Sequence, residues 1–387
     1  MSRRPTSGRR WRNLASLPSA HGAHPTAPVV VNGPGRVGRE FIRLLAEEAE
    51  RIGARARCLP ILRAVKSRRG ILFSHEGLTP QDVEDWLNAS VVETAGGPVW
   101  PALTGGANST SRLSAFSPAD YPLVLDLVRG EVPGVVVEAT STDLETGEPG
   151  LSHITTAMQK GFSAVSLAKG PLVVAFGALS SLARERGVSL RYSGAVAAAL
   201  PTVDTAIYSM AGAGIYEIEG VLNGTTNYIL NSMAGGKSYK AALAEAQAMG
   251  VAEANPRLDV EGFDSAAKLL IIANTVWGLG LRLSDVARQG ITTLGAGYVR
   301  DSALKGTPVR LVARAATGGA GPYLSVRPEA VPAGHPFANL PLTSKAVRFK
   351  SKNMGEVIVS GGASDVTGAA AAALKDLIHV LEERRLP

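Results

Sequence analysis

The hydrophobic residues of the first half of the chain occur in short runs that alternate with helical patterns. Val29–Val31 is a β-branched run, and an amphipathic helix over 39–50 is predicted after it. The runs Val135–Val137 and Ala164–Leu167 follow, with a helix predicted over 151–160 between them. Strands that alternate with helices predict an α/β fold with a parallel, doubly wound sheet. Its ligand is expected at the carboxyl ends of the strands.

The pattern changes in the second half. Between residues 193 and 283 the chain contains long alanine-rich helical stretches, predicted over 239–249 and 265–277. Near the end, a short strand over 356–359 and a final helix over 369–383 are predicted. We therefore expect a disordered basic tail over 1–27, a nucleotide-binding domain over 28–170, a second α+β domain over 171–345, and a return segment over 346–387 that completes the first domain.

Composition narrows the class of protein. The 387 residues are 45% hydrophobic and 19% charged, which is typical of a soluble chain with two domains. No apolar run approaches the roughly 18 residues needed to cross a bilayer, so no membrane partner is expected. The single cysteine, Cys58, excludes an internal disulfide and favours a cytoplasmic location. The six histidines lack the spacing of a zinc site, and we expect no metal centre.

The net charge of +7 is concentrated at the amino terminus. Five arginines lie in the first dozen residues, and no acid precedes Glu40. Without them a charge of about +2 remains, too little for a nucleic-acid-binding face. The tail lacks the apolar segment of a secretory signal. It resembles an organellar transit peptide in part, and a disordered extension or an upstream start codon is the alternative.

A glycine turn follows the first strand. Gly33, Gly35 and Gly38 form a G-x-G-x-x-G pattern that opens the first helix, with Arg36 and Val37 between the last two glycines. Glycines at this place allow a tight turn and a close approach to a pyrophosphate, and the helix amino terminus offers N–H groups to phosphate oxygens. The context predicts a dinucleotide site, although the motif alone is weak.

A group of acids and one lysine provides candidate chemistry. Asp264 and Lys268 stand four residues apart, so they share one face of a helix, and Glu253 and Asp259 precede them. The rest of that helix is apolar, which favours a buried lysine suited to proton transfer over a surface ion pair. Such a cluster suits an amino-acid substrate.

Two further segments leave alternatives open. Lys169 ends a predicted strand, where it lies either in solvent or beside the nicotinamide end of the crevice. The stretch Asn223–Tyr228 predicts a polar loop that binds the substrate, caps the following helix or packs under the site.

These segments together resemble the homoserine dehydrogenase family. The resemblance covers nearly all of 28–386, and Lys169 lies within the matching run Ser166–Leu172. The runs that carry it most strongly are Val221–Leu230, with the sequence VLNGTTNYIL, Gly250–Pro256, with GVAEANP, Asp259–Lys268, with DVEGFDSAAK, and Glu145–Ile154, with ETGEPGLSHI.

The resemblance implies a function. Members of this family interconvert L-homoserine and L-aspartate 4-semialdehyde in threonine, methionine and isoleucine biosynthesis, as cytoplasmic homodimers. By resemblance, Lys268 is the general acid/base, Asp264 positions it, and Lys169 assists at the reacting oxygen. Glu253 and Asp264 would hold the substrate ammonium, with Asp259 nearby. A short form without a regulatory domain is expected.

The cofactor is expected to be NADP, with NAD possible. An NAD site usually has an acid after the second strand, whereas this chain has Arg63, Lys66, Arg68 and Arg69 there. Basic residues suit a 2′-phosphate, and a solvated basic turn is the alternative. The expected cofactor-binding residues are Gly33, Gly35, Arg36, Val37, Gly38, Arg63, Lys66, Thr140, Lys169 and Gly250.

The chain departs from the family pattern at several positions. Ala168 replaces an asparagine, Ser193 a glutamate associated with an alkali cation, and Ala197–Ala199 a glycine-rich run. Asn255 replaces an acid, and the glycine loop at 360–364 is altered. Two alternatives therefore stay open: a relative that acts on another amino-acid alcohol or semialdehyde, and a nucleotide-binding relative without activity.

Overall fold

A computed structural model describes residues 24–90, 92–94, 97–99, 113–318, 321–362 and 364–383. The expected disorder of the tail concerns residues that lie almost wholly outside these ranges. The first strand, β1, covers Thr26–Asn32 and so begins slightly before the expected boundary at residue 28.

The first half of the chain builds a seven-stranded sheet in the order β6-β3-β2-β1-β7-β8-β9. The central strands β2, β1, β7, β8 and β9 are parallel, and β3 and β6 are antiparallel at one edge. The chain leaves β1 toward β2 and later returns on the other side of β1 to form β7. In sheets with such a reversal, the ligand is expected at the carboxyl ends of the two strands, here β1 and β7. The bounds are β2 Leu59–Lys66, β3 Ile71–Phe73, β6 Ser114–Phe116, β7 Val135–Glu138, β8 Ser163–Ser166 and β9 Leu190–Arg191.

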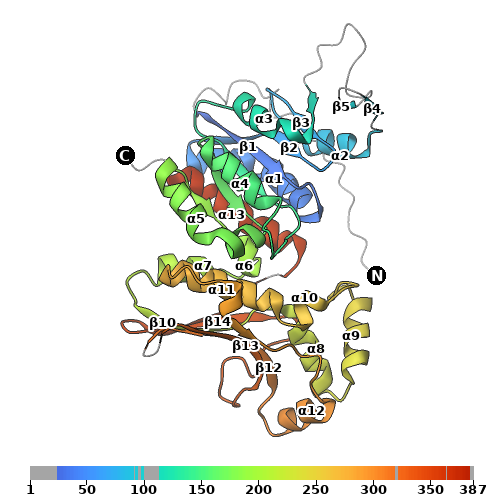
Figure 1. Ribbon diagram of the computed structural model, residues 1–387, viewed down its shortest axis with the longest axis vertical. Coiled ribbons are helices and arrows are strands. Elements are labelled where there is room, and N and C mark those ends of the chain that lie inside the picture. The colour runs from blue at the N-terminus through green and yellow to red at the C-terminus, as the bar shows by residue number, and fades with distance from the viewer. Residues whose placement is uncertain are drawn as a thin grey trace.

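Helices cover both faces of this sheet (Figure 1). Val29 and Val31 of β1 pack in one core with α1 (Arg36–Ala56) and α13 (Val366–Glu383), and Val30 packs in another core with α3. Burial on both sides explains why β1 is a continuous apolar run rather than an alternating one. The other helices of this half are α2 Pro80–Asn88, α3 Tyr121–Leu127, α4 Gly150–Gln159 and α5 Gly170–Arg186.

A six-stranded sheet in the order β11-β13-β12-β10-β14-β15 forms the second part. Helix α11 (Phe263–Trp277) packs on it, and the residues from Leu269 to Ala273 are completely buried. Figure 1 shows α11 between this sheet and the helices of the first part. The strands are β10 Ile215–Val221, β11 Val286–Arg288, β12 Val309–Ala316, β13 Tyr323–Ala330, β14 Lys345–Ser351 and β15 Gly355–Gly361. The helices are α6 Ser193–Ala197, α7 Thr202–Asp204, α8 Gly224–Ala234, α9 Tyr239–Ala248, α10 Arg257–Val260 and α12 Ala296–Leu304. A separate pair, β4 Val92–Thr94 and β5 Gly97–Val99, completes the described strands.

The α/β class with a doubly wound sheet and a second domain is as predicted. The expected return segment over 346–387 divides instead: β14 and β15 pair within the second sheet, and only α13 packs against α1. The predicted polar loop over 223–228 is also corrected, because Gly224–Tyr228 forms the first turns of α8. Its buried side chains are held by the sheet beneath it, which local polarity did not reveal.

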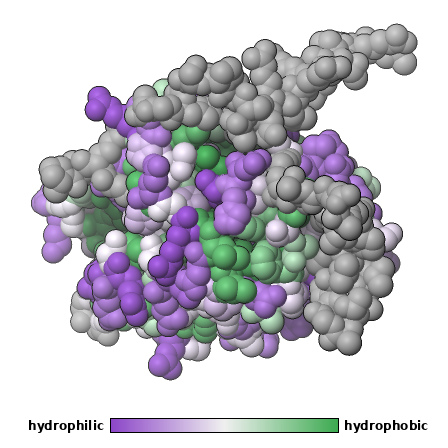
Figure 2. Space-filling model, turned by 90° about the horizontal axis from the view of Figure 1, so that it is seen from above, coloured by the Kyte–Doolittle hydropathy of each residue, from purple (hydrophilic) through white to green (hydrophobic). Residues whose placement is uncertain are grey.

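No helix in the described part of the chain is long and apolar enough to span a membrane. The face seen from above carries hydrophilic and hydrophobic side chains side by side (Figure 2). Exposed apolar side chains such as Leu123 and Leu127 of α3 are ordinary for a folded protein and indicate no partner by themselves.

Candidate active site

The site begins at the first turn of α11. The Nζ of Lys268 lies 2.6 Å from Oδ2 of Asp264, one helical turn away, and each side chain is only 13% exposed. The i,i+4 pair expected from the sequence is therefore formed in a largely buried position. An exposed pair of this kind would contribute little, whereas a buried one fixes both side chains.

Lys169 brings a second ammonium to the same carboxylate. It stands directly before α5, just beyond the carboxyl end of β8, and its Nζ lies 3.5 Å from Oδ1 of Asp264. Its backbone N–H donates to Oγ1 of Thr142 at 3.2 Å. Asp264 therefore lies between two lysines, one from each part of the molecule.

The charge state of Asp264 follows from these neighbours. Burial opposes its ionisation, but Lys268, Lys169 and the amide of Asn223 outweigh burial and hold the pKa of Asp264 well below its usual range. The carboxylate therefore stays charged near neutral pH and can hold both lysine side chains in place.

Asn223 connects the signature helix to the acids. Its Oδ1 accepts from the N–H of Thr226 at 2.9 Å and so caps α8. Its Nδ2 donates to Asp259 at 2.6 Å and to Asp264 at 2.9 Å. Of the alternatives for this segment, helix capping is thus observed, and the same side chain also positions two carboxylates.

Asp259 and Glu253 extend the negative charge toward the surface. Burial and the nearby charge of Asp264 raise the pKa of Asp259, and Glu253 adds to this effect from an exposed position. Carboxylates that repel one another at a partly open position favour a bound ammonium ion.

Sequence reasoning missed Lys345, which lies close enough to Lys268 and Asp264 for each to act on its charge. Lys345 is the first residue of β14 and the only fully buried lysine in the described part of the chain. The sequence around it gave little signal, because β14 also contains Arg348 and Lys350. Only the pairing of β14 with β10 shows that Lys345 lies near Lys268 and Asp264.

The glycine turn has the geometry of a phosphate-binding turn. Gly33 has φ +86°, and a Cβ there would lie 2.7 Å from backbone atoms of Ala139 and Thr140. A Cβ at Gly38 would lie 2.2 Å from the carbonyl of Gly33, whereas the space beside Gly35 is open. The N–H groups of Arg36, Val37 and Gly38 begin α1, where no helical partner exists for them. The turn therefore fits a dinucleotide pyrophosphate.

Thr140 lies beside this turn and is held by a buried acid. Its N–H donates to Oε1 of Glu138 at 2.8 Å, and its hydroxyl donates to the same oxygen. Glu138 also contacts Nδ1 of His153 at 2.8 Å and accepts from Asn32 at 3.2 Å. This network fixes the ends of β1 and β7 around the crevice, and it gives His153 a structural contact.

The basic residues near β2 occupy different places. Lys66 ends the strand, and its ammonium lies 5.8 Å from the centre of the Tyr121 ring. Arg68 is exposed in the following turn, while the guanidinium of Arg69 donates to backbone carbonyls at 2.8 and 2.7 Å. Arg63 lies in mid-strand and is half-buried, so the structure does not place its backbone at the ligand edge.

Gly250 lies in the second part, just after α9, with φ +71°. This conformation ends the helix and is sufficient to explain the glycine. The structure therefore provides no contact that joins Gly250 to the glycine turn among the described residues.

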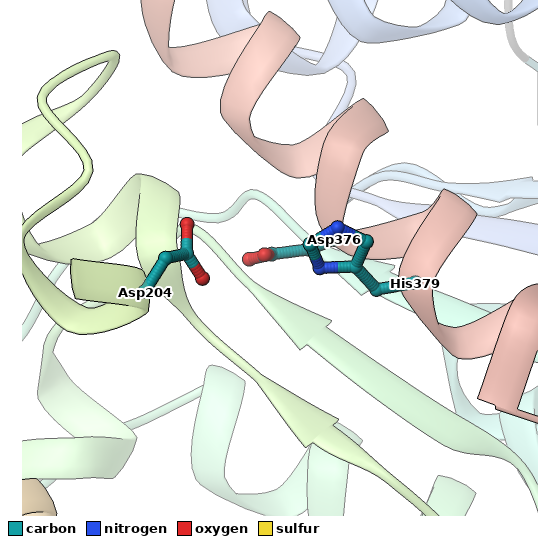
Figure 3. A group of neighbouring side chains, drawn as sticks. All are labelled: Asp204, Asp376 and His379. Carbon is teal, nitrogen blue, oxygen red and sulfur yellow. The ribbon is translucent and has the colours of Figure 1, made fainter. Parts of the chain in front are cut away.

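A separate cluster lies where α7 meets α13. Ligand atoms of Asp204, Asp376 and His379 lie within 4.8 Å of one another (Figure 3). The ammonium of Lys375 contacts both carboxylates, at 2.8 Å from Asp376, and donates to the hydroxyl of Ser193 at 2.8 Å. Because this ammonium already contacts both carboxylates, we assign no metal to the cluster.

A doubly wound sheet with a phosphate-binding turn, facing a second domain that contributes a lysine and a carboxylate, defines the architecture of a nicotinamide-dependent oxidoreductase. Comparison with known proteins agrees. A sequence model described as homoserine dehydrogenase matches residues 201–378. The homoserine dehydrogenase of Methanocaldococcus jannaschii is 30% identical over 353 residues, which cover 91% of this chain and 98% of that protein. An NAD(+)-dependent homoserine dehydrogenase of Pseudomonas canavaninivorans is 35% identical over 64% of this chain and 70% of its own length.

Solved structures show the same fold. The crystal structure of a homoserine dehydrogenase from Thiobacillus denitrificans superposes with a TM-score of 0.75 at 25% identity, over 94% of this chain and 77% of that chain. A hyperthermophilic archaeal homoserine dehydrogenase in complex with NADPH superposes with a TM-score of 0.73 at 21% identity, over 94% and 99%. The chain belongs to the homoserine dehydrogenase family.

Proposed function

We propose that the protein is a homoserine dehydrogenase that interconverts L-homoserine and L-aspartate 4-semialdehyde, in the biosynthesis of threonine, methionine and isoleucine. The observation that carries this proposal is the carboxylate of Asp264 shared between Lys268 and Lys169. These residues come from the two parts of the molecule and flank the end of the nucleotide crevice, where a hydride and a proton must be exchanged together.

The roles of the residues follow from their positions. Lys268 exchanges the proton of the substrate hydroxyl, and Asp264 and the carbonyl of Leu222, 2.9 Å from its Nζ, aim the amine. Lys169 stabilises the same oxygen as negative charge develops on it. Asp259, Glu253 and Asp264 bind the substrate ammonium. The nicotinamide cofactor supplies the hydride acceptor, and the protein orients the substrate carbon against it.

NADP is the proposed cofactor, with NAD as a possible substitute. Lys66 and Arg68 lie at and just after the carboxyl end of β2, and no acid lies next to them in the sequence, which suits a 2′-phosphate. Relatives of both kinds exist, since one is named NAD(+)-dependent and another was solved with NADPH. Arg36, Val37 and the three glycines of the turn would hold the pyrophosphate, with Thr140 beside them.

The assay is direct. Purified protein mixed with L-homoserine and NADP at alkaline pH should produce NADPH, because oxidation of the alcohol releases a proton and high pH removes it. A lack of NADPH formation with either nucleotide would exclude the proposal. The inactive-relative alternative is disfavoured because Lys169, Asp264 and Lys268 are assembled.

A second candidate keeps the chemistry and changes the substrate. Ala198 has φ +52° and ψ −120°, a conformation that L residues rarely adopt, within the alanine run that departs from the family pattern. Added methyl groups there could reshape the pocket for another amino-acid alcohol. If another γ-hydroxy amino acid gave a far higher kcat/KM than homoserine, this candidate would replace the first.

We also propose that the protein acts as a cytoplasmic homodimer. The strand β15 forms one edge of the second sheet and exposes Ile358, and Tyr323 of β13 is also exposed. An open edge with apolar side chains suits pairing with a second copy. Sedimentation equilibrium measures this directly, and a monomer at micromolar concentration would exclude it.

A further inference from the structure

Lys345 is a buried lysine whose side chain connects β14 to the end of α6. It starts β14, is 2% exposed, and its Nζ donates to the carbonyl oxygen of Ala197, at the end of α6, at 2.6 Å. The side chain therefore reaches from the second sheet toward the segment that leaves the first domain. Lysine is rarely buried in this way, so packing among hydrophobic side chains does not explain the residue.

The register of the second sheet places Lys345 beside Lys268. Val221, the last residue of β10, pairs with Ala346, the residue after Lys345, so Leu222 and Lys345 both adjoin this last pair. The carbonyl of Leu222 is the one that accepts from Lys268. Lys345 is therefore close to the backbone carbonyl that accepts a hydrogen bond from Lys268, the proposed proton-transferring residue.

The segment before Lys345 is fixed by the signature helix. The amide of Asn227, in α8, donates to the carbonyls of Pro341 and Ser344 at 2.9 and 3.1 Å. The start of β14 is therefore anchored to the same helix whose cap, Asn223, positions Asp259 and Asp264. A rigid attachment of this kind is what a ligand-binding cation needs.

The charge of Lys345 lacks a partner of opposite sign. Among the described residues no carboxylate forms an ion pair with it, and one carbonyl oxygen accepts one of its three hydrogens. Burial, reinforced by the ammonium of Lys268, lowers the pKa of Lys345 to about 8, against the opposite effect of Asp264 and Asp365, which form no ion pair with it. Buried charges are normally paired, so this site is incomplete without an anion.

We propose that Lys345 binds the α-carboxylate of the amino-acid substrate and selects for substrates that carry it. This inference rests on the proposed function and adds a residue to it. The other two ammonium groups of the site, on Lys169 and Lys268, both contact Asp264. The acids Asp259 and Glu253 suit the substrate ammonium, which leaves Lys345 as the cation available for the carboxylate.

The contact with Ala197 gives the same residue a positioning role. It holds the carbonyl just before Ala198, whose φ of +52° needs support from its surroundings. A role confined to this turn would affect every substrate alike. A role in carboxylate binding would affect only substrates that carry the carboxylate.

The test compares L-homoserine with its carboxamide and with 3-aminopropan-1-ol, which lacks the carboxylate altogether. With Lys345→Met, the KM for homoserine should rise about 10- to 100-fold, the range of a hydrogen bond to a charged group, while kcat changes little. The kcat/KM for the two analogues without a carboxylate should stay within about threefold of the wild-type value. Lys350→Met is the matched control, since Lys350 lies on the same strand and pairs with Glu217.

Several outcomes would overturn the inference. They are an unchanged KM for homoserine in Lys345→Met, or an equal loss for homoserine and for the analogues. If Lys345→Met melts well below the wild type, Lys345→Arg is measured instead, and it should keep the preference for homoserine over its carboxamide. The proposed function fails separately, if the wild-type protein does not oxidise homoserine at all. In that case calorimetric binding of homoserine and its carboxamide to the wild-type protein with NADP still tests Lys345, and equal affinities contradict it.

Discussion

The division of labour between Lys268 and Glu253 can be resolved by kinetics. Lys268→Ala should lower kcat by about 10²-fold or more, the usual scale of general acid–base catalysis, with little effect on the affinity for NADP. Glu253→Ala should mainly raise the KM for homoserine, because an exposed ammonium-binding acid acts on ground and transition states alike. Steady-state kinetics with both substrates varied measures each. A near-normal kcat in Lys268→Ala would remove the proposed proton transfer from this residue.

The lowered pKa of Lys345 predicts a pH-dependent contribution to stability. Between its folded value of about 8 and the usual 10.5, the unfolded chain binds a proton that the folded chain lacks. The free energy of unfolding therefore rises with pH in this window, by up to about 1.4 kcal/mol per pH unit for this group. The groups that act on Lys345 are Lys268 and Asp264 of α11, and Asp365 before α13.

The comparison of wild type with Lys345→Met isolates this effect. Chemical denaturation at pH 7 and pH 10 should show the stability of the wild type, relative to the variant, increasing with pH. A constant difference would mean that Lys345 is charged in the folded protein at both values, in conflict with an unpaired buried ammonium.

At the scale of elements, we expect the end of β2 to set the choice of cofactor. Arg68→Ala should weaken NADP by about 10-fold, because a charge-assisted contact with the 2′-phosphate is lost, and should leave NAD nearly unchanged. Arg63→Ala is the contrasting variant, since Arg63 lies in mid-strand. Fluorescence titration with each nucleotide provides the affinities. If Arg63→Ala alone lost NADP selectivity, the guanidinium would have to reach the crevice from within the strand.

At the scale of the whole molecule, Lys375 stabilises the junction of α7 and α13. In Lys375→Met, Asp376 stays buried and keeps only the N–H and hydroxyl of Ser193, at 2.8 and 2.9 Å, as partners. Loss of one partner of a buried ion pair should cost roughly 3 kcal/mol in the free energy of unfolding. Thermal or chemical unfolding measures it, with the exposed Lys352→Met as control. A loss as small as that of the control would show that the acid is satisfied by Ser193 alone.

Local patterns in the sequence determined much of this protein. The apolar runs and the glycine turn predict the doubly wound sheet, because strand and helix periods and tight turns are local properties. The spacing of Asp264 and Lys268 likewise predicts their pairing, since four residues make about one helical turn. The family resemblance added the expected roles of Lys169 and Glu253, which spacing alone left open and which the kinetic variants test.

Tertiary structure decided the rest, because pairings between distant segments leave no local trace. The strands β14 and β15 joined the second sheet although they precede the helix that returns to the first. Asn223 became both a helix cap and a link between two acids only when α8 met α11. The register of β14 beside β10 places Lys345 near the site. Segments far away in the chain bury it, and burial leaves its charge without an ion-pair partner.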